Sequence, residues 1–366
     1  MIHKVHIQNF KCLREVSVEL ERFTVFVGAN GSGKTSVLEA IDLAVRAATG
    51  SPEKVFGYER HCDWLYSRGG EGDLSIKCVT QSGEFSVSAS PGLLFPSAPE
   101  LLGKSNDWDI SVDPASDPSL EAALRPARSL VFLHLNAQQL SKASYSERDP
   151  PRVEHDGQGL ASVLAYMALN DPDAFDELLA HMRSLIPQLR RIRFRKAPVR
   201  RIEKEYIRIG DESVLRRTTR VYQGEAILFD FTNAEDVSAH TVSEGTLMLL
   251  GILTVLLGPF HPKILLMDDI EHGLHPLAQR SLLGVLEQVM QKFPDLQILA
   301  SAHSPYLLDQ LKPEQVRVMT IGKDGYSVCG RLDNHPQFAK WKDEMAPGEL
   351  WSLFGEKWLT AEGVAR

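Results

Sequence analysis

Several features that mark particular protein classes are missing from this chain of 366 residues. Its four cysteines are scattered, and no pair has the spacing of a metal or redox motif, so we expect a reducing environment. The longest apolar run, residues 247–258, is too short to cross a bilayer as a helix and predicts a buried helix instead. The amino-terminal residues lack the pattern of a signal peptide. We therefore expect a cytoplasmic protein with no membrane partner.

Internal repeats, sustained heptads and an overall basic charge are also absent. The net charge of −8 excludes a general basic coat for nucleic acid, although it allows a local basic patch. Between residues 49 and 224 no heptad pattern persists, which excludes coiled-coil arms and predicts a compact head without arms. The composition is that of a globular protein, and the length predicts more than one lobe.

The sequence does contain a phosphate-binding loop, Gly-x-x-x-x-Gly-Lys-Thr, at residues 28–35. An apolar run precedes it and helical spacing follows it, which is the strand-to-helix context that the motif requires. The backbone N–H groups of such a loop surround phosphate oxygens, its lysine reaches the β- and γ-phosphates, and its threonine holds Mg²⁺. A glycine-rich turn without a ligand is the alternative. The predicted nucleotide-binding residues here are Asn30, Gly31, Ser32, Gly33, Lys34, Thr35 and Ser36.

Polar residues follow two other apolar runs. Residues 264–267 lead into Asp268 and Asp269, which is typical of a strand that brings one carboxylate to Mg²⁺ and a second to the attacking water. His303 follows the apolar run 296–300 at a position suited to sensing a γ-phosphate. A simple turn and a core or capping histidine are the respective alternatives.

Ser243 precedes the long apolar helix and can cap it. A functional interpretation is a second anion site, in which Ser243, the backbone of Gly245 and the helix N-terminus face a γ-phosphate bound by another subunit.

Hydrophobic periodicity predicts an α/β chain. We expect irregular structure over residues 50–70 and 89–127, and a loop over 141–157. Helices are predicted at 36–46, 160–169, 173–185, from 243 onward, 276–292, from 305 to 311, and in the tail 333–366. Strands are predicted at 2–9, 16–20, 23–27, 73–80, 84–88, 129–135, within 188–220, and at 226–231, 263–267 and 296–300.

The segment 188–220 is strongly basic, with twelve Lys or Arg against four Asp or Glu. Residues 190–220 could contact the phosphates of DNA or RNA, although the aromatic residues are too few for base stacking. A solvated strand face, or contact with an acidic protein, is the alternative.

Together these motifs resemble the ABC-type ATPase head of the SMC, RecF and OLD (overcoming lysogenisation defect) group. The resemblance covers roughly residues 1–48 and 238–312. It rests on residues 5–13, the loop 28–35, Ser-Glu-Gly-Thr at 243–246, Glu-x-Gly-Leu-His-Pro at 271–276 and Ser-Ala-His-Ser-Pro at 301–305.

The resemblance implies an α/β P-loop NTPase fold with an ABC-ATPase-type head, a β-rich subdomain and a helical, basic insertion. Residues 1–50 and 225–330 would form the ATPase core, 51–224 the inserted region with its basic segment 188–220, and 331–366 a helical tail.

The resemblance also implies ATP and Mg²⁺, and a homodimer or higher homo-oligomer whose heads enclose ATP. Lys34, Thr35 and Asp268 would act on the nucleotide of their own subunit, Thr35 and Asp268 as magnesium ligands. Ser243 and Gly245 would act on the partner's nucleotide, and residues 271–276 would follow the seam.

A glutamine commonly senses Mg²⁺ in this fold, and Gln138 is the predicted magnesium ligand, with Gln139 as its neighbour. His272 and His275 have a spacing that could suggest a metal, but the group's pattern argues against one.

This chain departs from the group at Asp269, where the group usually has Glu. The shorter side chain predicts slow hydrolysis, with Glu271 assisting. The predicted catalytic residues are Asp269, His303 and Glu271.

These features predict an ATPase switch subunit that controls a separate effector, a nuclease or toxin. Such a subunit resembles the ATPases of Septu-type, PARIS-type and retron anti-phage systems. Only 63 residues follow His303, without a suitable acidic cluster, so we expect no Toprim nuclease domain like that of OLD proteins. A RecF-like ATPase that binds duplex DNA for repair and a non-hydrolysing ATP-dependent scaffold are the alternatives.

Overall fold

The computed structural model describes residues 1–49, 65–90, 109–112, 124, 128–209 and 212–360. Contacts divide the chain into two compact units. Unit 1 comprises residues 1–132, 262–271 and 287–366, and unit 2 comprises residues 133–261 and 272–286. Each unit is described separately below. The predicted division into core, insertion and tail follows similarity to a family rather than contacts, and it remains a prediction.

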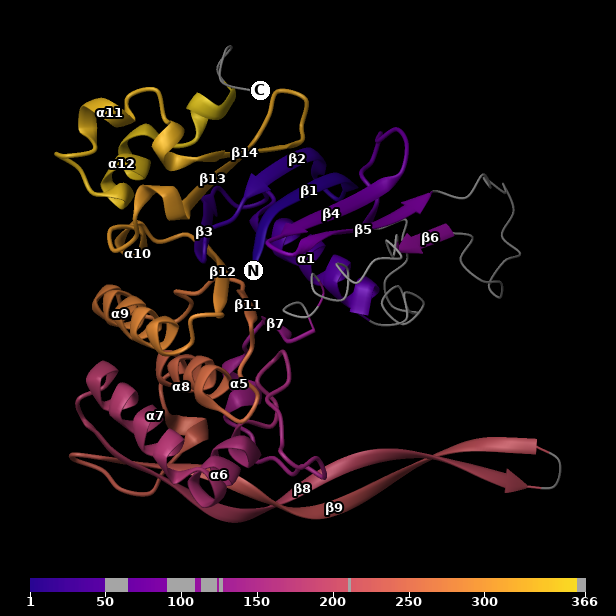
Figure 1. The fold of residues 1–366 in the computed structure, drawn as a ribbon. Coiled ribbons are helices and arrows are strands. Elements are labelled where there is room, and N and C mark those ends of the chain that lie inside the picture. The colour runs from indigo at the N-terminus through magenta and orange to yellow at the C-terminus, as the bar shows by residue number, and fades with distance from the viewer. Residues whose placement is uncertain (50–64, 91–108, 113–123, 125–127, 210–211, 361–366) are drawn as a thin grey trace. The chain divides into compact units, whose positions relative to one another are not determined.

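Unit 1 contains a six-stranded sheet in the order β14-β13-β3-β12-β11-β7 (Figure 1). Strand β3 (Phe23–Gly28) is parallel to both of its neighbours, β12 (Gln297–Ala302) and β13 (Val316–Ile321). Strand β12 is in turn parallel to β11 (Ile264–Met267). Every residue of β3, β11 and β12 is buried, which explains why their sequences are mostly apolar. β7 (Leu130–Leu133) and β14 (Ser327–Arg331) form the edges.

A second sheet in unit 1 is antiparallel, in the order β2-β1-β4-β5-β6. Its alternating sequences bury one face, and α1 (Lys34–Thr49) packs against β1, β4 and β5. Val37, Leu38, Ile41 and Val45, which recur at helical spacing in α1, are buried in this core. The strands are β1 (Ile2–Phe10), β2 (Leu13–Glu19), β4 (Leu74–Thr80), β5 (Gly83–Ser90) and β6 (Asp109–Val112).

Two sequence predictions in unit 1 need correction, and one hairpin was not predicted. Strand β6 lies within the expected loop 89–127. The hairpin of β13 and β14 was not predicted, and the helix expected from 305 to 311 ends at Leu308. Most of the irregular regions expected at 50–70 and 89–127 lie outside the described residues.

The tail is partly helical, with α10 (Pro305–Leu308) preceding it and then α11 (Phe338–Trp341) and α12 (Pro347–Phe354). The 3₁₀ helices of unit 1 are η2 (Pro313–Gln315), η3 (Leu332–Asn334) and η4 (Lys357–Thr360).

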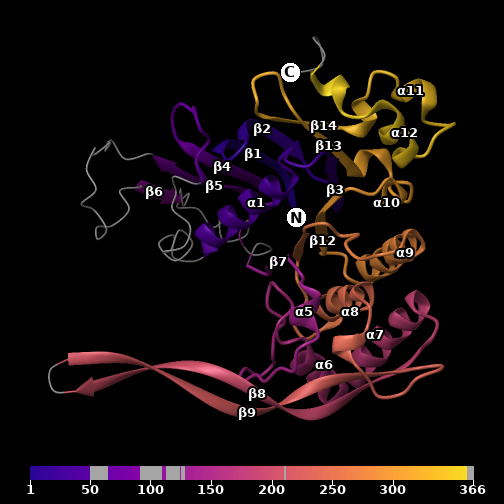
Figure 2. The ribbon, with the colours of Figure 1, turned by 180° about the vertical axis from the view of Figure 1, so that it is seen from behind.

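Unit 2 is built around the apolar helix α8 (Glu244–Leu257), which is buried over nearly its whole length. Helices α6 (Leu160–Asn170) and α7 (Pro172–Leu185) lie between α8 and the strands β8 and β9 in both views (Figures 1 and 2). Short α5 (Ala137–Leu140) and η1 (Ala239–Thr241) complete this region. Helix α9 (Pro276–Lys292) begins in unit 2 and ends in unit 1. None of the helices among the described residues is both long and apolar enough to cross a membrane.

The basic segment of unit 2 forms one long two-stranded ribbon. Strand β8 (Leu189–Ile209) pairs antiparallel with β9 (Glu212–Phe231), and the short β10 (Val237–Ser238) pairs with the other edge of β9. The run 226–231, predicted as a separate strand, is therefore the end of β9. The absence of coiled-coil arms from the whole insertion remains a prediction, and in β8 and β9 two-residue alternation forms a β-ribbon.

Candidate functional site

The phosphate loop lies between β3 and α1, and its backbone conformation depends on glycine. Gly28, Gly31 and Gly33 have positive φ angles of 145°, 78° and 100°, which residues with a Cβ rarely adopt. At Gly33 a Cβ would also lie 2.5 Å from Ser327 Oγ. The loop can therefore turn its N–H groups inward around an anion.

Lys34 is buried at the start of α1 and bends back over the loop. Its Nζ donates to the backbone carbonyls of Gly28 at 2.9 Å and Ala29 at 3.1 Å. Burial lowers the pKa of Lys34, while the nearby carboxylates of Asp269 and Asp268 raise it. The ammonium group is thus held at the loop, where phosphate oxygens could replace the carbonyls as its partners.

Thr35 meets Asp268 at the end of β11. Its Oγ1 donates to the carboxylate, with distances of 2.9 Å to Oδ1 and 3.0 Å to Oδ2. Ser301 Oγ donates to the same Oδ1 at 2.5 Å. Because β3, β12 and β11 are adjacent and parallel, their carboxyl ends bring these residues together at one edge of the sheet.

Asp269 and His303 form the outer part of this site. Asp269 has a φ of 47°, a left-handed conformation that Asp tolerates, and its N–H donates to Ser301 Oγ at 2.8 Å. His303 Nε2 lies 3.3 Å from Asp269 Oδ1, with both side chains partly exposed. The sequence therefore predicted two residues that the fold pairs directly.

Glu271 is positioned by the same loop. Its Oε1 accepts a short hydrogen bond from the backbone N–H of His303, and its Oε2 is buried without a partner among the described residues. Burial raises the pKa of Glu271, and the charge of Asp269 adds to this effect. Glu271 thus holds the strand end that carries His303.

ATP and Mg²⁺ can be tested against these residues. Ser32 Oγ is buried in the loop without a hydrogen-bond partner among the described residues, as expected for a group that faces an absent phosphate. The Thr35 hydroxyl and Asp268 carboxylate are the oxygen ligands that Mg²⁺ prefers. The residues fit both groups. Thr35 and Asp268 would hold the ion, which would neutralise charge on the phosphates.

The other predicted loop residues have less specific surroundings. Asn30 and Gly31 are exposed, and Ser36 Oγ lies 3.7 Å from the thiol of Cys12. Gln138 belongs to unit 2, where its side chain is exposed and its backbone carbonyl accepts from Ser141 Oγ at 3.0 Å. Its role as a magnesium ligand remains a prediction.

Ser243 and Gly245 lie at the N-terminus of α8 in unit 2. Ser243 is exposed and caps the helix, since its Oγ accepts from Thr246 N at 3.3 Å. A Cβ at Gly245 would lie 2.5 Å from the carbonyl oxygen of Gly273. Glu244 and His272 lie 3.3 Å apart, so this segment packs on the loop that follows Glu271. The capping interpretation is correct, and the role toward a partner's nucleotide remains a prediction.

Ser301 is the residue whose role the sequence did not suggest. It was noted only as part of the Ser-Ala-His-Ser-Pro motif, yet it contacts both Asp268 and the backbone of Asp269. One signal was available: it is a hydroxyl that follows the apolar residues Ile298, Leu299 and Ala300 in a fully buried strand.

Two family models match parts of this chain. Residues 99–309, more than half of the chain, match the family described as "AAA domain, putative AbiEii toxin, Type IV TA system". Residues 1–84 match the family described as "AAA ATPase domain".

Two curated relatives match over short stretches. The chain is 42% identical to the OLD nuclease of Thermus scotoductus over 45 residues, which are 12% of this chain and 8% of that protein. It is 28% identical to the Retron Vc95 probable ATPase of Vibrio cholerae over 99 residues, which are 24% of this chain and 19% of that protein. The matches thus span less than a fifth of either relative.

Solved structures of Smc heads share the fold. One, bound to the C-terminal winged-helix domain of ScpA, gives a TM-score of 0.58 at 14% identity, covering 90% of this chain and 97% of the other. An Smc head with an extended coiled coil from Pyrococcus furiosus gives 0.55 at 13% identity, covering 94% and 99%. The chain belongs to the AAA domain family that residues 99–309 match, and it shares the fold of Smc heads.

Proposed function

We propose that this chain is an ATP-dependent switch subunit, in which two copies close around ATP and control a separate effector. The contact of Thr35 and Ser301 with Asp268, beside the phosphate loop, carries the ATPase part of the proposal. Lys34 would bind the β- and γ-phosphates, and His303 would face the γ-phosphate. The Asp269 carboxylate would accept a proton from the attacking water.

Slow turnover follows from the environment of Asp269. Its side chain is one methylene shorter than glutamate, and its Oδ1 is already 3.3 Å from His303 Nε2. That oxygen is therefore already engaged by His303 before a water can approach it. Each ATP would therefore remain bound for a long time before hydrolysis.

The dimer part of the proposal is supported by Ser243 and its helix. Ser243 is exposed at the N-terminus of a 14-residue helix, where partial positive charge and free N–H groups favour an anion. A γ-phosphate held by a second copy would supply that anion. Closure would then require ATP, because ADP lacks the γ-phosphate.

The effector part rests on the family and on one relative. The family description refers to a toxin and a Type IV TA system, and one relative is named as a retron ATPase. We propose a nuclease or toxin as the controlled protein, in defence against phage.

Measurement of the mass of the purified protein tests the switch directly. We expect a monomer with ADP and a dimer with ATP and Mg²⁺, most clearly in the Asp269→Asn variant, which retains its ATP. A monomer at saturating ATP, with nucleotide binding confirmed in the same sample, contradicts the proposal.

A further inference from the structure

Where the side chains of the β8–β9 ribbon are described, five of them lie on one exposed face. Partners across an antiparallel ladder share a face, so Arg200 with Val221 and Ile202 with Thr219 lie on the same side, and the register continues to Arg217. All five side chains are exposed. We call Arg200, Ile202, Arg217, Thr219 and Val221 the outer face.

The opposite face makes contacts within the chain. Arg201 donates to the carbonyl of Tyr145 at 3.1 Å and lies over its ring. Tyr222 stacks on Tyr145 with ring centroids 4.5 Å apart, and both Tyr222 and Arg220 contact the carboxylate of Glu203. The charges and rings of this side are therefore already partnered.

The outer face combines cations with exposed apolar side chains. Ile202 is 71% exposed and Val221 is 62% exposed, between the two arginines Arg200 and Arg217. The five residues include no carboxylate, and neither arginine contacts one among the described side chains. Water-exposed apolar groups between unpaired cations are typical of a surface that binds an anionic partner.

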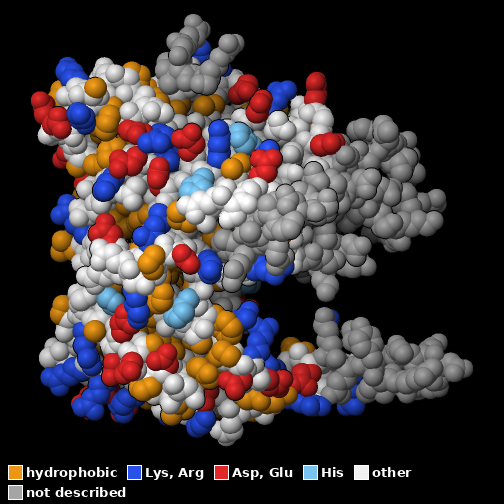
Figure 3. Space-filling model, in the orientation of Figure 1, with side chains coloured by type: hydrophobic (Ala, Val, Ile, Leu, Met, Phe, Trp, Pro, Cys, Tyr) orange, Lys and Arg blue, Asp and Glu red, His pale blue; other side chains and the backbone are white. Residues whose placement is uncertain are grey.

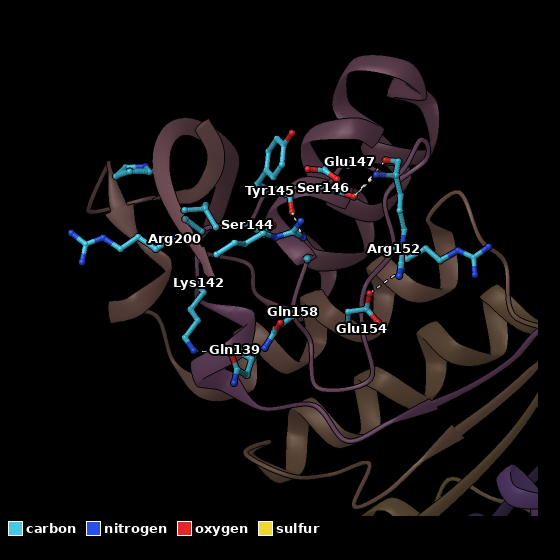
Figure 4. Close-up of a pocket in the computed structure, with 16 residues that line it drawn as sticks. Gln139, Lys142, Ser144, Tyr145, Ser146, Glu147, Arg152, Glu154, Gln158 and Arg200 are labelled. Atoms are coloured by element: carbon cyan, nitrogen blue, oxygen red, sulfur yellow. Dashed lines mark hydrogen bonds and ion pairs between the residues drawn. The ribbon is translucent and has the colours of Figure 1, made fainter. Parts of the chain in front are cut away.

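A cavity of about 810 Å³ at the base of the ribbon is also lined by positively charged residues, one of which is Arg200. Figure 4 shows Lys142 and Arg200 on one side of it and Glu154 on the other. Only Glu147 and Glu154 are acidic, and Glu154 is paired with Arg148 at 3.0 Å. The cationic residues that line it are Lys142, Arg152 and Arg200, together with Arg148, which pairs with Glu154, and Arg201, which belongs to the partnered opposite face. Figure 3 shows Lys and Arg side chains together with Asp and Glu side chains along the ribbon's base.

We propose that the outer face and this cavity bind duplex DNA, with the ribbon in a groove and the cations on the phosphates. The major groove of B-DNA, about 12 Å wide, admits a two-stranded β-ribbon. Arginine and lysine supply phosphate contacts, and exposed Ile and Val can contact thymine methyl groups. An acidic protein would also complement the positive charge of this surface. The shape of the surface, a narrow two-stranded ribbon exposed on one face, fits a DNA groove better than it fits a protein. DNA binding by this surface is independent of ATP hydrolysis.

The test uses the full chain and a fluorescent 30-base-pair duplex, titrated without nucleotide at several salt concentrations. We expect Arg200→Glu/Arg217→Glu to weaken binding at least tenfold. We also expect the slope of log affinity against log salt to fall by about two, because each phosphate contact contributes roughly 0.9. The conservative Arg200→Lys/Arg217→Lys variant should retain most of the affinity and the slope.

The matched control is Arg190→Glu/Arg195→Glu, which makes the same charge change at two exposed arginines of β8 near the helices. It should weaken binding less than threefold. Circular dichroism and ATP binding, unchanged in all variants, show that they fold. The proposal is overturned if the wild type fails to bind the duplex, if it prefers single strands, duplex RNA or polyglutamate, or if the control loses as much affinity as the outer-face variant.

Discussion

Asp268 is held by hydroxyl groups from two different segments, Thr35 of the phosphate loop and Ser301 of β12. Ser301 also accepts from the backbone N–H of Asp269. One buried serine therefore fixes both acidic residues, although it would not itself contact the nucleotide. Its effect on catalysis should pass through the position of these carboxylates.

Ser301→Ala tests this positioning role. Loss of the two contacts leaves Asp268 less well oriented, so Mg²⁺ should bind more weakly. We expect the Mg²⁺ concentration for half-maximal turnover to rise about tenfold, the effect of one or two hydrogen bonds. Ser281→Ala, an exposed serine on α9, is the control and should change nothing. Magnesium titrations of ATP turnover measure the difference, and an unchanged Ser301→Ala curve would refute the role.

Asp269→Asn tests the proton acceptor. The amide cannot accept a proton, so we expect turnover to fall by about 10² or more while ATP affinity changes little. Single-turnover measurements of phosphate release separate the two quantities. Unchanged turnover would reject Asp269 as the base, and no turnover in the wild type would favour the ATP-dependent scaffold instead.

Glu271 gives a prediction for pH. Burial raises its pKa in the folded chain, so folding favours the protonated form, and this contribution is lost as the pH rises through the raised pKa. Glu271→Gln keeps an acceptor for the His303 N–H but carries no charge. We expect the variant to be more stable than the wild type at pH 8, with the advantage disappearing at acidic pH. Urea unfolding at several pH values measures this, and a constant difference would contradict it.

At the scale of elements, the sequence predicted the helices and strands that have a strong hydrophobic pattern. The apolar runs 263–267 and 296–300 correspond to β11 and β12, and the helix at 276–292 was predicted with its observed bounds. Motif spacing then placed Thr35 and Asp268 together. The hairpin of β13 and β14 was missed because only its parallel pairing with β3, which is distant in sequence, shows that it belongs to the sheet.

The ribbon shows what the sequence could not supply. Alternation predicted strands within 188–220, but neither their length nor their register follows from a local pattern. The number of basic residues in this segment also does not show which arginines form ion pairs and which are exposed. Arg193 is bound by Asp230 and Asp236, whereas Arg200 and Arg217 lie on the exposed outer face. Some of the basic residues in this segment therefore stabilise the fold and are not available to a partner.

Arg193→Ala tests the structural role of that arginine. The hydrogen bonds from Arg193 lower the pKa of Asp230, so the stability they provide is present above the ordinary range of Asp and is lost as the pH falls through the lowered pKa. We expect a lower melting temperature at pH 7 and a smaller difference near pH 2. Arg195→Ala, an exposed neighbour, should melt like the wild type. Equal melting of Arg193→Ala and wild type would contradict the prediction.

On the scale of the whole molecule, charge is distributed unevenly. The chain carries −8 overall, yet residues 188–220 hold twelve Lys or Arg against four Asp or Glu. Such asymmetry steers a polyanion toward one region and repels it elsewhere. In an ATP-bound dimer, the two ribbons would present two such regions on one assembly.

Ser243→Arg tests that assembly. The larger side chain at the exposed cap should block the approach of a second copy, while the phosphate loop of the same chain keeps its ATP. We expect ATP binding within threefold of wild type and no dimer by sedimentation in the Asp269→Asn background. Thr241→Arg, an exposed position just before the helix, is the steric control. If the Ser243→Arg variant still forms dimers, the second copy does not bind at the N-terminus of α8, and the prediction is wrong.

The close approach of Gly245 to the backbone of Gly273 leaves no room for even one methyl group. A displacement of the start of α8 would therefore push against the turn after Glu271. Pressure on one from a neighbouring molecule would be transmitted to the other, and so to the acidic residues just upstream. In a pair of such molecules, the two nucleotides would not be consumed as independent events: the first hydrolysis would alter the rate of the second.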